Sequence, residues 1–198
     1  NIKMKKDIIL AGVGGQGILS IATVIGEAAL TNGLHIKQAE VHGMSQRGGD
    51  VHSNLRLSSD PISSDLIPTG GVDIIISLEP MEALRYVGSL SKEGWIVTST
   101  IPFINIPNYP DTEEVIKHIK AIPNNVMLDV ETLAKNAGAP AQASNMVLLG
   151  AAVPMLGIEY DAIKEAVRKI FSRKGEEIVN SNLAALDAGY QYSIESTK

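Results

Sequence analysis

Residues 8–17 (IILAGVGGQG) are an apolar run that leads directly into a glycine-rich turn. A continuous run of aliphatic residues is typical of a strand that is buried on both faces, as at the centre of a parallel sheet. After the turn, apolar residues recur at helical spacing from Ile18 to Ala29, and Asn32 and Gly33 supply a stop signal. The stretch therefore predicts a strand, a glycine turn and a helix, in that order.

Similar units follow along the chain. Strands are predicted at 34–41, 51–57, 72–77, 95–98 and 126–128. Further helices are predicted from Pro80, from Asp111, before Gly138, and twice after residue 160. An unusually apolar helix is expected to be capped by Ser144, interrupted by Pro154 and closed near Gly157.

Alternating strands and helices predict an α/β fold, a three-layer Rossmann-like sandwich with a mostly parallel central sheet. Residues 4–198 are expected to form one domain, with Met4 as a plausible natural start. Right-handed crossovers would place the glycine turn at the carboxyl edge of the sheet, where α/β proteins meet their ligands.

Composition narrows the class of function. The chain has no cysteine, so it offers no thiolate nucleophile, no cysteine zinc site and no cysteine ligand for an iron–sulfur cluster. A net charge of −5 argues against nucleic acid as a partner. No segment suits a signal peptide or a membrane span, so no membrane contact and a cytoplasmic location are expected.

The histidines give no metal signal, because no two of them lie at the i, i+4 spacing of ligands on one helix face. No metal site is therefore predicted. His42 and His52 lie on either side of a second glycine-rich stretch, where they are acid–base groups or, as we favour, simple polar contacts.

The first turn fits the spacing G-x-G-x-x-G through Gly12, Gly14 and Gly17. In this context the first glycine permits the turn, the second lets backbone approach an anion, and the third allows close helix packing. The alternative is a tight strand-to-helix turn that binds nothing. In a dinucleotide site, Glu40 could also bind a ribose hydroxyl, as it lies 23 residues beyond Gly17.

The second stretch contains Arg47, Gly48 and Gly49, which can offer a guanidinium fork and two backbone amides to a phosphate or carboxylate. An ordinary surface loop with a solvated arginine explains the same residues. A third interpretation is that Glu40 pairs with Arg47 and orders the loop.

Three segments together, 14–17, 40–49 and 145–150, resemble the small catalytic subunit or domain of 2-oxoacid:ferredoxin oxidoreductases. The run 42–49 (HGMSQRGG) is most similar to the beta subunit of the indolepyruvate-specific enzymes. The resemblance covers essentially the whole chain, and segment 40–49 is more specific than the glycine turn.

The resemblance implies an enzyme that decarboxylates an aryl 2-oxoacid on thiamine diphosphate and magnesium, passes electrons through 4Fe-4S clusters to ferredoxin, and transfers the acyl group to coenzyme A. It also implies that a large partner subunit holds the thiamine diphosphate and the clusters. This chain would complete the active site through Glu40 and Arg47, without acid or base catalysis. Whether the glycine turn contacts coenzyme A, the substrate or only the partner subunit stays open. The expected cofactor-binding residues are Gly12, Gly14, Gly15, Gln16, Gly17, Arg47, Gly48, Gly49 and Asn145.

Two other classes of function stay open from the residues alone. One is a self-sufficient NAD(P)- or flavin-dependent oxidoreductase that uses the glycine turn with Glu40 on the ribose. The other is a nucleotide-binding module without enzymatic activity, in which the apolar helix after Ser144 forms a dimer contact. A homodimer of the isolated chain is compatible with each interpretation.

Overall fold

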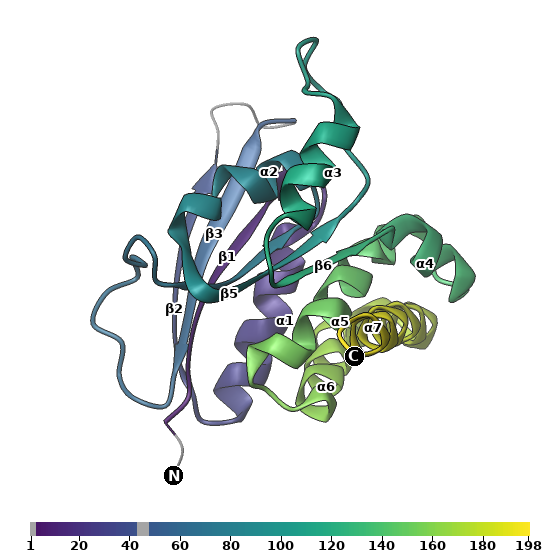
Figure 1. Ribbon diagram of the computed structural model, residues 1–198. Coiled ribbons are helices and arrows are strands. Elements are labelled where there is room, and N and C mark those ends of the chain that lie inside the picture. Colours follow the sequence, from purple (N-terminus) through teal and green to yellow (C-terminus); the bar gives the residue numbers. More distant parts are fainter. Residues whose placement is uncertain (1–2, 43–47) are drawn as a thin grey trace.

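The structure, a computed structural model, describes residues 3–42 and 48–198, except for the side chain of His42 (Figure 1). Six strands form one sheet in the order β2-β3-β1-β4-β5-β6. Their bounds are β1 Lys5–Val13, β2 His35–His42, β3 Asp50–Ser58, β4 Val72–Ser77, β5 Leu90–Ser99 and β6 Asn125–Leu128. The first strand is buried from Asp7 onward, as the apolar run predicts.

The sheet is mixed but mostly parallel. Strands β1, β4, β5 and β6 pair in parallel, whereas β3 is antiparallel to both β1 and β2. Only residues 43–49 separate β2 from β3, and a parallel connection needs a crossover of about a dozen residues or more. This short connection explains why one side of the sheet departs from the alternation of strand and helix.

Helices cover both faces of the sheet, which confirms the three-layer α/β fold (Figure 1). One face carries the larger core and the other a smaller one beneath α2 and α3. On the smaller face lie α2 Pro80–Arg85 and α3 Thr112–Lys120. On the larger face lie α1 Ile18–Thr31, α4 Val130–Asn136, α5 Ser144–Leu156, α6 Tyr160–Phe171 and α7 Glu176–Ser196. Short 3₁₀ turns complete the chain: η1 Val87–Ser89, η2 Ala141–Ala143 and η3 Ser172–Lys174.

Helix α5 differs from the sequence prediction at both ends. Ser144 is its first residue and makes no capping hydrogen bond, because the turn η2 brings Ala143 into the cap position. Pro154 lies inside the helix and does not interrupt it. The proline falls in the last turn, so little of the helical hydrogen bonding is lost before the left-handed Gly157 ends the helix. The expected burial of this helix is confirmed.

Among residues 3–42 and 48–198, no helix combines the length and apolar character needed to cross a membrane.

Candidate functional site

A cleft of about 550 Å³ opens at the carboxyl edge of the parallel strands. The glycine turn after β1, the ends of β4 and β5, and the first residues of α5 and α7 surround it. Of the expected ligand residues, Gly15, Gln16, Gly17 and Asn145 line the cleft. Sequence positions 130 residues apart are thus brought together where α/β folds bind ligands.

The two glycines at the cleft have the left-handed backbone that glycine tolerates best. Gly15 has φ +101° and Gly17 has φ +86°. A Cβ on Gly17 would lie 2.6 Å from Nδ2 of Asn145, whereas one on Gly15 would meet open space. Gly17 is therefore required both for the turn and for the approach of Asn145, which agrees with the close packing predicted for it.

Gly12 and Gly14 have other roles than predicted. Gly12 is a residue of β1, and a Cβ there would lie 2.9 Å from Oε1 of Gln16. It therefore makes room for a side chain and does not itself form the turn. Gly14 donates its backbone N–H to the carbonyl of Gly49 at 2.9 Å, so this amide is engaged within the protein.

Gln16 closes the turn from inside. Its Oε1 accepts the backbone N–H of Val13 at 2.7 Å, and its Nε2 donates to the carbonyl of Leu78 at 3.3 Å. The side chain thereby joins the ends of β1 and β4, which makes it a structural element of the cleft floor.

Helices α1 and α5 begin at the cleft without a side-chain cap. The cap position of α1 is Gly17 and that of α5 is Ala143, and neither end receives a capping hydrogen bond from a side chain. The backbone amides of Gly15 and Gly17 donate to no other residue that the structure describes. Free amides at helix N-termini carry partial positive charge and attract anions.

Asn145 links the two helix ends. Its Nδ2 donates to the carbonyl of Gly17 at 3.2 Å across the cleft floor. The residue is only 7% exposed, and its buried Oδ1 has no hydrogen-bond partner among the described residues. A buried acceptor without a partner is costly, so a donor brought by a ligand would be stabilised here.

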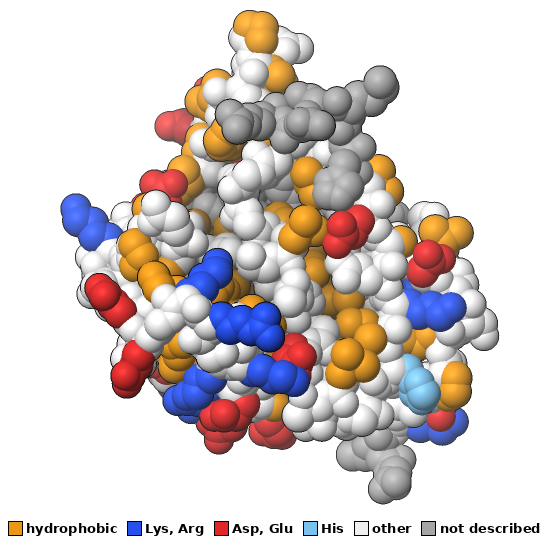
Figure 2. All heavy atoms as spheres, turned by 180° about the vertical axis from the view of Figure 1, so that it is seen from behind, with side chains coloured by type: hydrophobic (Ala, Val, Ile, Leu, Met, Phe, Trp, Pro, Cys, Tyr) orange, Lys and Arg blue, Asp and Glu red, His pale blue; other side chains and the backbone are white. Residues whose placement is uncertain are grey.

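Sequence reasoning missed Lys174, the only lysine or arginine among the described residues that line the cleft. It ends η3, and its Nζ lies 5.5 Å from the centre of the Phe171 ring, which also lines the cleft. Figure 2 shows Lys and Arg side chains gathered over the region of α6 and η3. In the sequence this lysine is one exposed charge between two amphipathic helices, so no local signal distinguishes it.

The second glycine stretch lies beside the first. Gly48 has φ +76°, and its carbonyl accepts a hydrogen bond from the amide of Asn105, while Gly49 accepts the one from Gly14. The expected role of Arg47 lies outside the described residues. Gly48 and Gly49 do not line the cleft, but they border the turn that does.

Glu40 is exposed on β2, where it accepts a hydrogen bond from Nε2 of Gln38 at 2.8 Å. Strand β3 separates β2 from β1, so Glu40 lies about 10 Å, two strand spacings, from the strand that carries the glycine turn. A ribose-binding acid belongs on the strand next to that turn. The topology therefore does not favour the dinucleotide alternative.

His52 points away from the cleft. Its ring contacts Tyr86 at 5.0 Å on the face of the sheet that α2 covers, whereas Leu55 and Leu57 of the same strand belong to the core on the other face. Burial lowers its pKa, which keeps the imidazole neutral. No group of three or more His, Asp or Glu side chains suited to a metal exists in the described part of the chain.

Fold and cleft together define an α/β protein that presents free backbone donors and the cation of Lys174 at the carboxyl edge of its sheet. The chain belongs to the pyruvate ferredoxin/flavodoxin oxidoreductase family, whose model matches residues 7–192. It is a small, gamma-type subunit of a 2-oxoacid:ferredoxin oxidoreductase.

Relatives support this placement over nearly the whole length. Indolepyruvate oxidoreductase subunit IorB of Archaeoglobus fulgidus is 36% identical, covering 96% of both chains, and that of Pyrococcus horikoshii gives the same figures. The common gamma subunit of the pyruvate/ketoisovalerate oxidoreductases of Pyrococcus furiosus is 27% identical over 91% of this chain and 92% of that protein.

Solved structures show the same fold. The gamma subunit of a keto/oxoacid ferredoxin oxidoreductase from Geobacter sulfurreducens matches with a TM-score of 0.70 and 22% identity, covering 96% of this chain and 99% of that one. A 2-oxoglutarate:ferredoxin oxidoreductase from Magnetococcus marinus, solved with 2-oxoglutarate, coenzyme A and succinyl-CoA, matches with a TM-score of 0.75 and 23% identity. There the match covers 96% of this chain and 31% of the longer one.

Proposed function

We propose that this subunit serves an enzyme acting on indolepyruvate or a related arylpyruvate, and that its cleft binds coenzyme A for the acyl transfer step. Four relatives named as indolepyruvate oxidoreductase subunits, at 31–36% identity, support this choice of substrate. Relatives named for other 2-oxoacids reach 26–28%.

The reactive cofactors belong on a large partner subunit. This chain has no cysteine for a cluster, and its described residues hold no candidate metal group, so they do not fit the clusters or the magnesium of thiamine diphosphate. Thiamine diphosphate would supply the decarboxylation chemistry, and the clusters would carry the electrons to ferredoxin. A cytoplasmic location remains a prediction.

One observation carries the coenzyme A proposal: the free backbone amides of Gly15 and Gly17 before α1, the buried acceptor of Asn145 and the cation of Lys174 meet in one cleft. Coenzyme A brings phosphate groups for the amides and the cation, and N–H and O–H donors for the buried oxygen. The cleft volume of about 550 Å³ lies within the range of small-molecule sites. The Magnetococcus structure, which was solved with coenzyme A bound, has the same fold.

This chain's residues would therefore bind and orient, without moving protons. The backbone amides of Gly15 and Gly17 would hold an anionic group, and Lys174 would neutralise a second one at the rim of the cleft. Arg47, with Gly48 and Gly49, is proposed to reach a phosphate or the substrate carboxylate beside the same turn. Glu40 is proposed to help order that stretch.

The test uses the assembled enzyme, with coenzyme A as the varied substrate. Lys174→Ala is expected to raise the KM for coenzyme A about tenfold, since it removes one charge-assisted contact, and to leave the KM for the 2-oxoacid unchanged. Lys120→Ala, on the opposite face of the sheet, is the matched control and should leave both values unchanged.

Arg47→Ala is the second variant in this test. An unchanged assembly and an unchanged coenzyme A saturation would remove Arg47 from the proposed site. Unchanged saturation in Lys174→Ala as well would contradict the assignment of the cleft to coenzyme A.

A further inference from the structure

The segment between β5 and α3, residues 100–111, is an apolar projection beyond the carboxyl edge of the sheet. It carries Phe103, Ile104 and Ile106, which are 42%, 67% and 37% exposed. These are three of the nine large hydrophobic side chains exposed among the described residues. Figure 1 shows the segment as the part that extends furthest at one end of the molecule, and Figure 2 shows hydrophobic side chains at that end. We call residues 100–111 the arm.

The arm is held in place from within the protein. The carboxylate of Glu79 is 1% exposed and accepts hydrogen bonds from the hydroxyl of Tyr109 and from the backbone N–H of Phe103, the latter at 3.3 Å. Burial, followed by the contact with Glu79, raises the pKa of Tyr109, so its hydroxyl stays protonated and donates. Three prolines restrict the backbone further. The arm is therefore preformed, and binding a partner would cost little ordering entropy.

The arm also continues the wall of the cleft. Ile101, Pro102 and Phe103 line the cleft, and two residues further on Asn105 donates to the carbonyl of Gly48. The same segment thus contacts both the cleft and the second glycine stretch. The outer part of the arm therefore adjoins one wall of the cleft.

We propose that the arm is the docking surface for the cofactor-carrying subunit, and that docking there closes the coenzyme A cleft. This inference rests on the proposed function. A small ligand in the cleft would leave Ile104 exposed, because this side chain is not part of the cleft wall. Large exposed apolar groups that lie together mark surfaces to which another protein binds.

Two further observations favour the other subunit over a second copy of this chain. The chain is one subunit of a multisubunit enzyme, and in some relatives the matching region is only 31–36% of a longer polypeptide. The same unit thus occurs joined to further protein. A second copy would bring no reactive group to the cleft, since it has the same residues.

The test compares two exposed sites in assembly with the large subunit. The double variant Ile104→Ser with Ile106→Ser removes apolar surface outside the cleft, and the control Leu30→Ser with Leu66→Ser changes side chains 59% and 66% exposed elsewhere. Sedimentation titration should show at least about tenfold weaker binding for the arm variant and binding within about twofold of wild type for the control. Both variants should melt like the wild-type chain when isolated.

Unchanged assembly of the arm variant would overturn the docking proposal. If, in addition, the isolated wild-type chain is a dimer that the arm variant converts to a monomer, the arm is an interface between copies. The proposed function is judged separately from turnover of indolepyruvate and coenzyme A by the assembled wild-type enzyme. If the assembled wild-type enzyme turns over normally and the arm variant binds the large subunit as tightly as wild type does, only the docking inference is wrong.

Discussion

At Gly17 a single hydrogen atom in place of a side chain decides the geometry of the cleft floor. Its φ of +86° favours glycine, and the space that a Cβ would fill is occupied by the amide of Asn145. Gly15 shares the first property, with φ +101°, but not the second. Substitutions at the two positions therefore separate the cost of backbone strain from the cost of disturbing Asn145.

Gly17→Ala is expected to lower the free energy of unfolding by about 1 kcal/mol more than Gly15→Ala. Both variants carry the strain of a non-glycine residue at positive φ, about 1–3 kcal/mol, but only Gly17→Ala also displaces Asn145 from its hydrogen bond. Urea unfolding of the two variants side by side measures the difference. Equal losses would show that the contact with Asn145 contributes nothing.

The histidine on β3 predicts a pH dependence. Burial lowers the pKa of His52 from 6.5, against a smaller opposing effect of Asp50 and Glu82. A histidine whose pKa is lower in the folded state than in the unfolded state takes up its proton preferentially on unfolding. Stability is therefore retained above about pH 6.5 and lost as the pH falls through the lowered pKa.

His52→Gln should remove this part of the acid destabilisation, because glutamine does not titrate. Unfolding midpoints in urea between pH 7.5 and 5 should fall more steeply for wild type than for the variant. Parallel curves would mean that the pKa of His52 is the same in the folded and unfolded chain.

For single residues, the sequence predicts the glycines of the site better than it predicts the side chains that distant segments bring beside them. Gly15, Gln16, Gly17 and Asn145 were expected in one site, and the structure brings them to one cleft. The sequence predicts neither Lys174 in the cleft nor Glu79 as the anchor of the arm, because a charged residue in a turn or before a helix looks the same whether or not a distant segment packs on it. Only the tertiary fold gives those two side chains their neighbours.

Among the elements, α5 and α7 pack unusually closely. A Cβ on Gly150 of α5 would lie 2.0 Å from the carbonyl oxygen of Leu186, and one on Gly189 of α7 would lie 1.8 Å from that of Val147. Both obstacles are backbone atoms, so neither can move without shifting a helix. These two glycines allow the helices to cross in direct backbone contact.

Gly189→Ala is therefore expected to destabilise the chain by about 3 kcal/mol or more, despite the better helix propensity of alanine. Gly88→Ala is the control, because a Cβ there meets nothing within 4 Å. Thermal melting of the two variants checks this expectation. A variant Gly189→Ala as stable as the control would contradict the close crossing.

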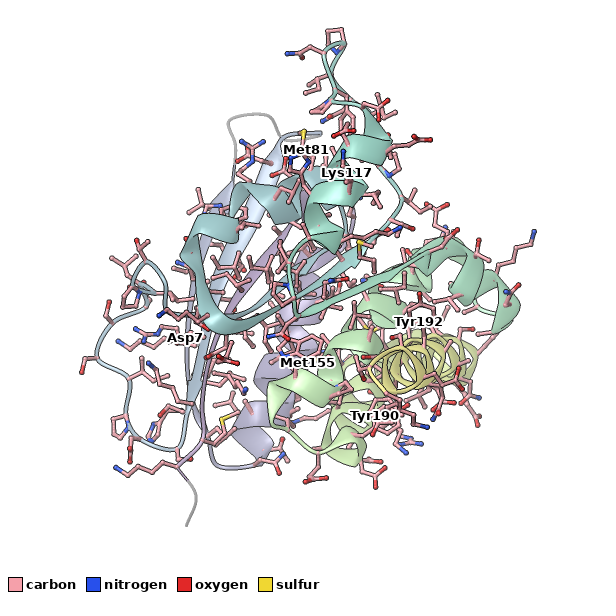
Figure 3. All side chains as sticks on the ribbon, in the orientation of Figure 1. Asp7, Met81, Lys117, Met155, Tyr190 and Tyr192 are labelled. Atoms are coloured by element: carbon pink, nitrogen blue, oxygen red, sulfur yellow. The ribbon has the colours of Figure 1, made fainter. Side chains whose placement is uncertain are left out.

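Among the helices and strands, the sequence did not predict which distant segments pack against each other. Strand β1, the turn and helix α1 follow from local patterns alone. A glycine inside a helical pattern indicates only a weak helix, and its use in a crossing depends on a partner far along the chain. Tyr190 and Tyr192 of α7, labelled in Figure 3, show the same dependence. Tyr190 stacks on Tyr160 at 4.0 Å, and Tyr192 donates its hydroxyl to the carbonyl of Met127.

The whole molecule combines a rigid α/β body with an open cleft and a preformed arm on the same edge. The body is held together even at its periphery: buried Asp7 pairs with Arg56 at 2.7 Å, and Arg56 in turn donates to the carbonyls of Ser64 and Leu66 in the loop after β3 (Figure 3). A rigid scaffold of this kind suits a subunit that contributes shape and charge to a reaction carried by a neighbour.

Reconstitution tests this account most directly. The purified chain, the large subunit and their mixture are assayed separately for reduction of ferredoxin by indolepyruvate in the presence of coenzyme A. We predict turnover in the mixture alone, with the rate saturating as this chain is added in equal proportion. Turnover by the large subunit without this chain, or by this chain by itself, would contradict the central claim that neither is a complete catalyst.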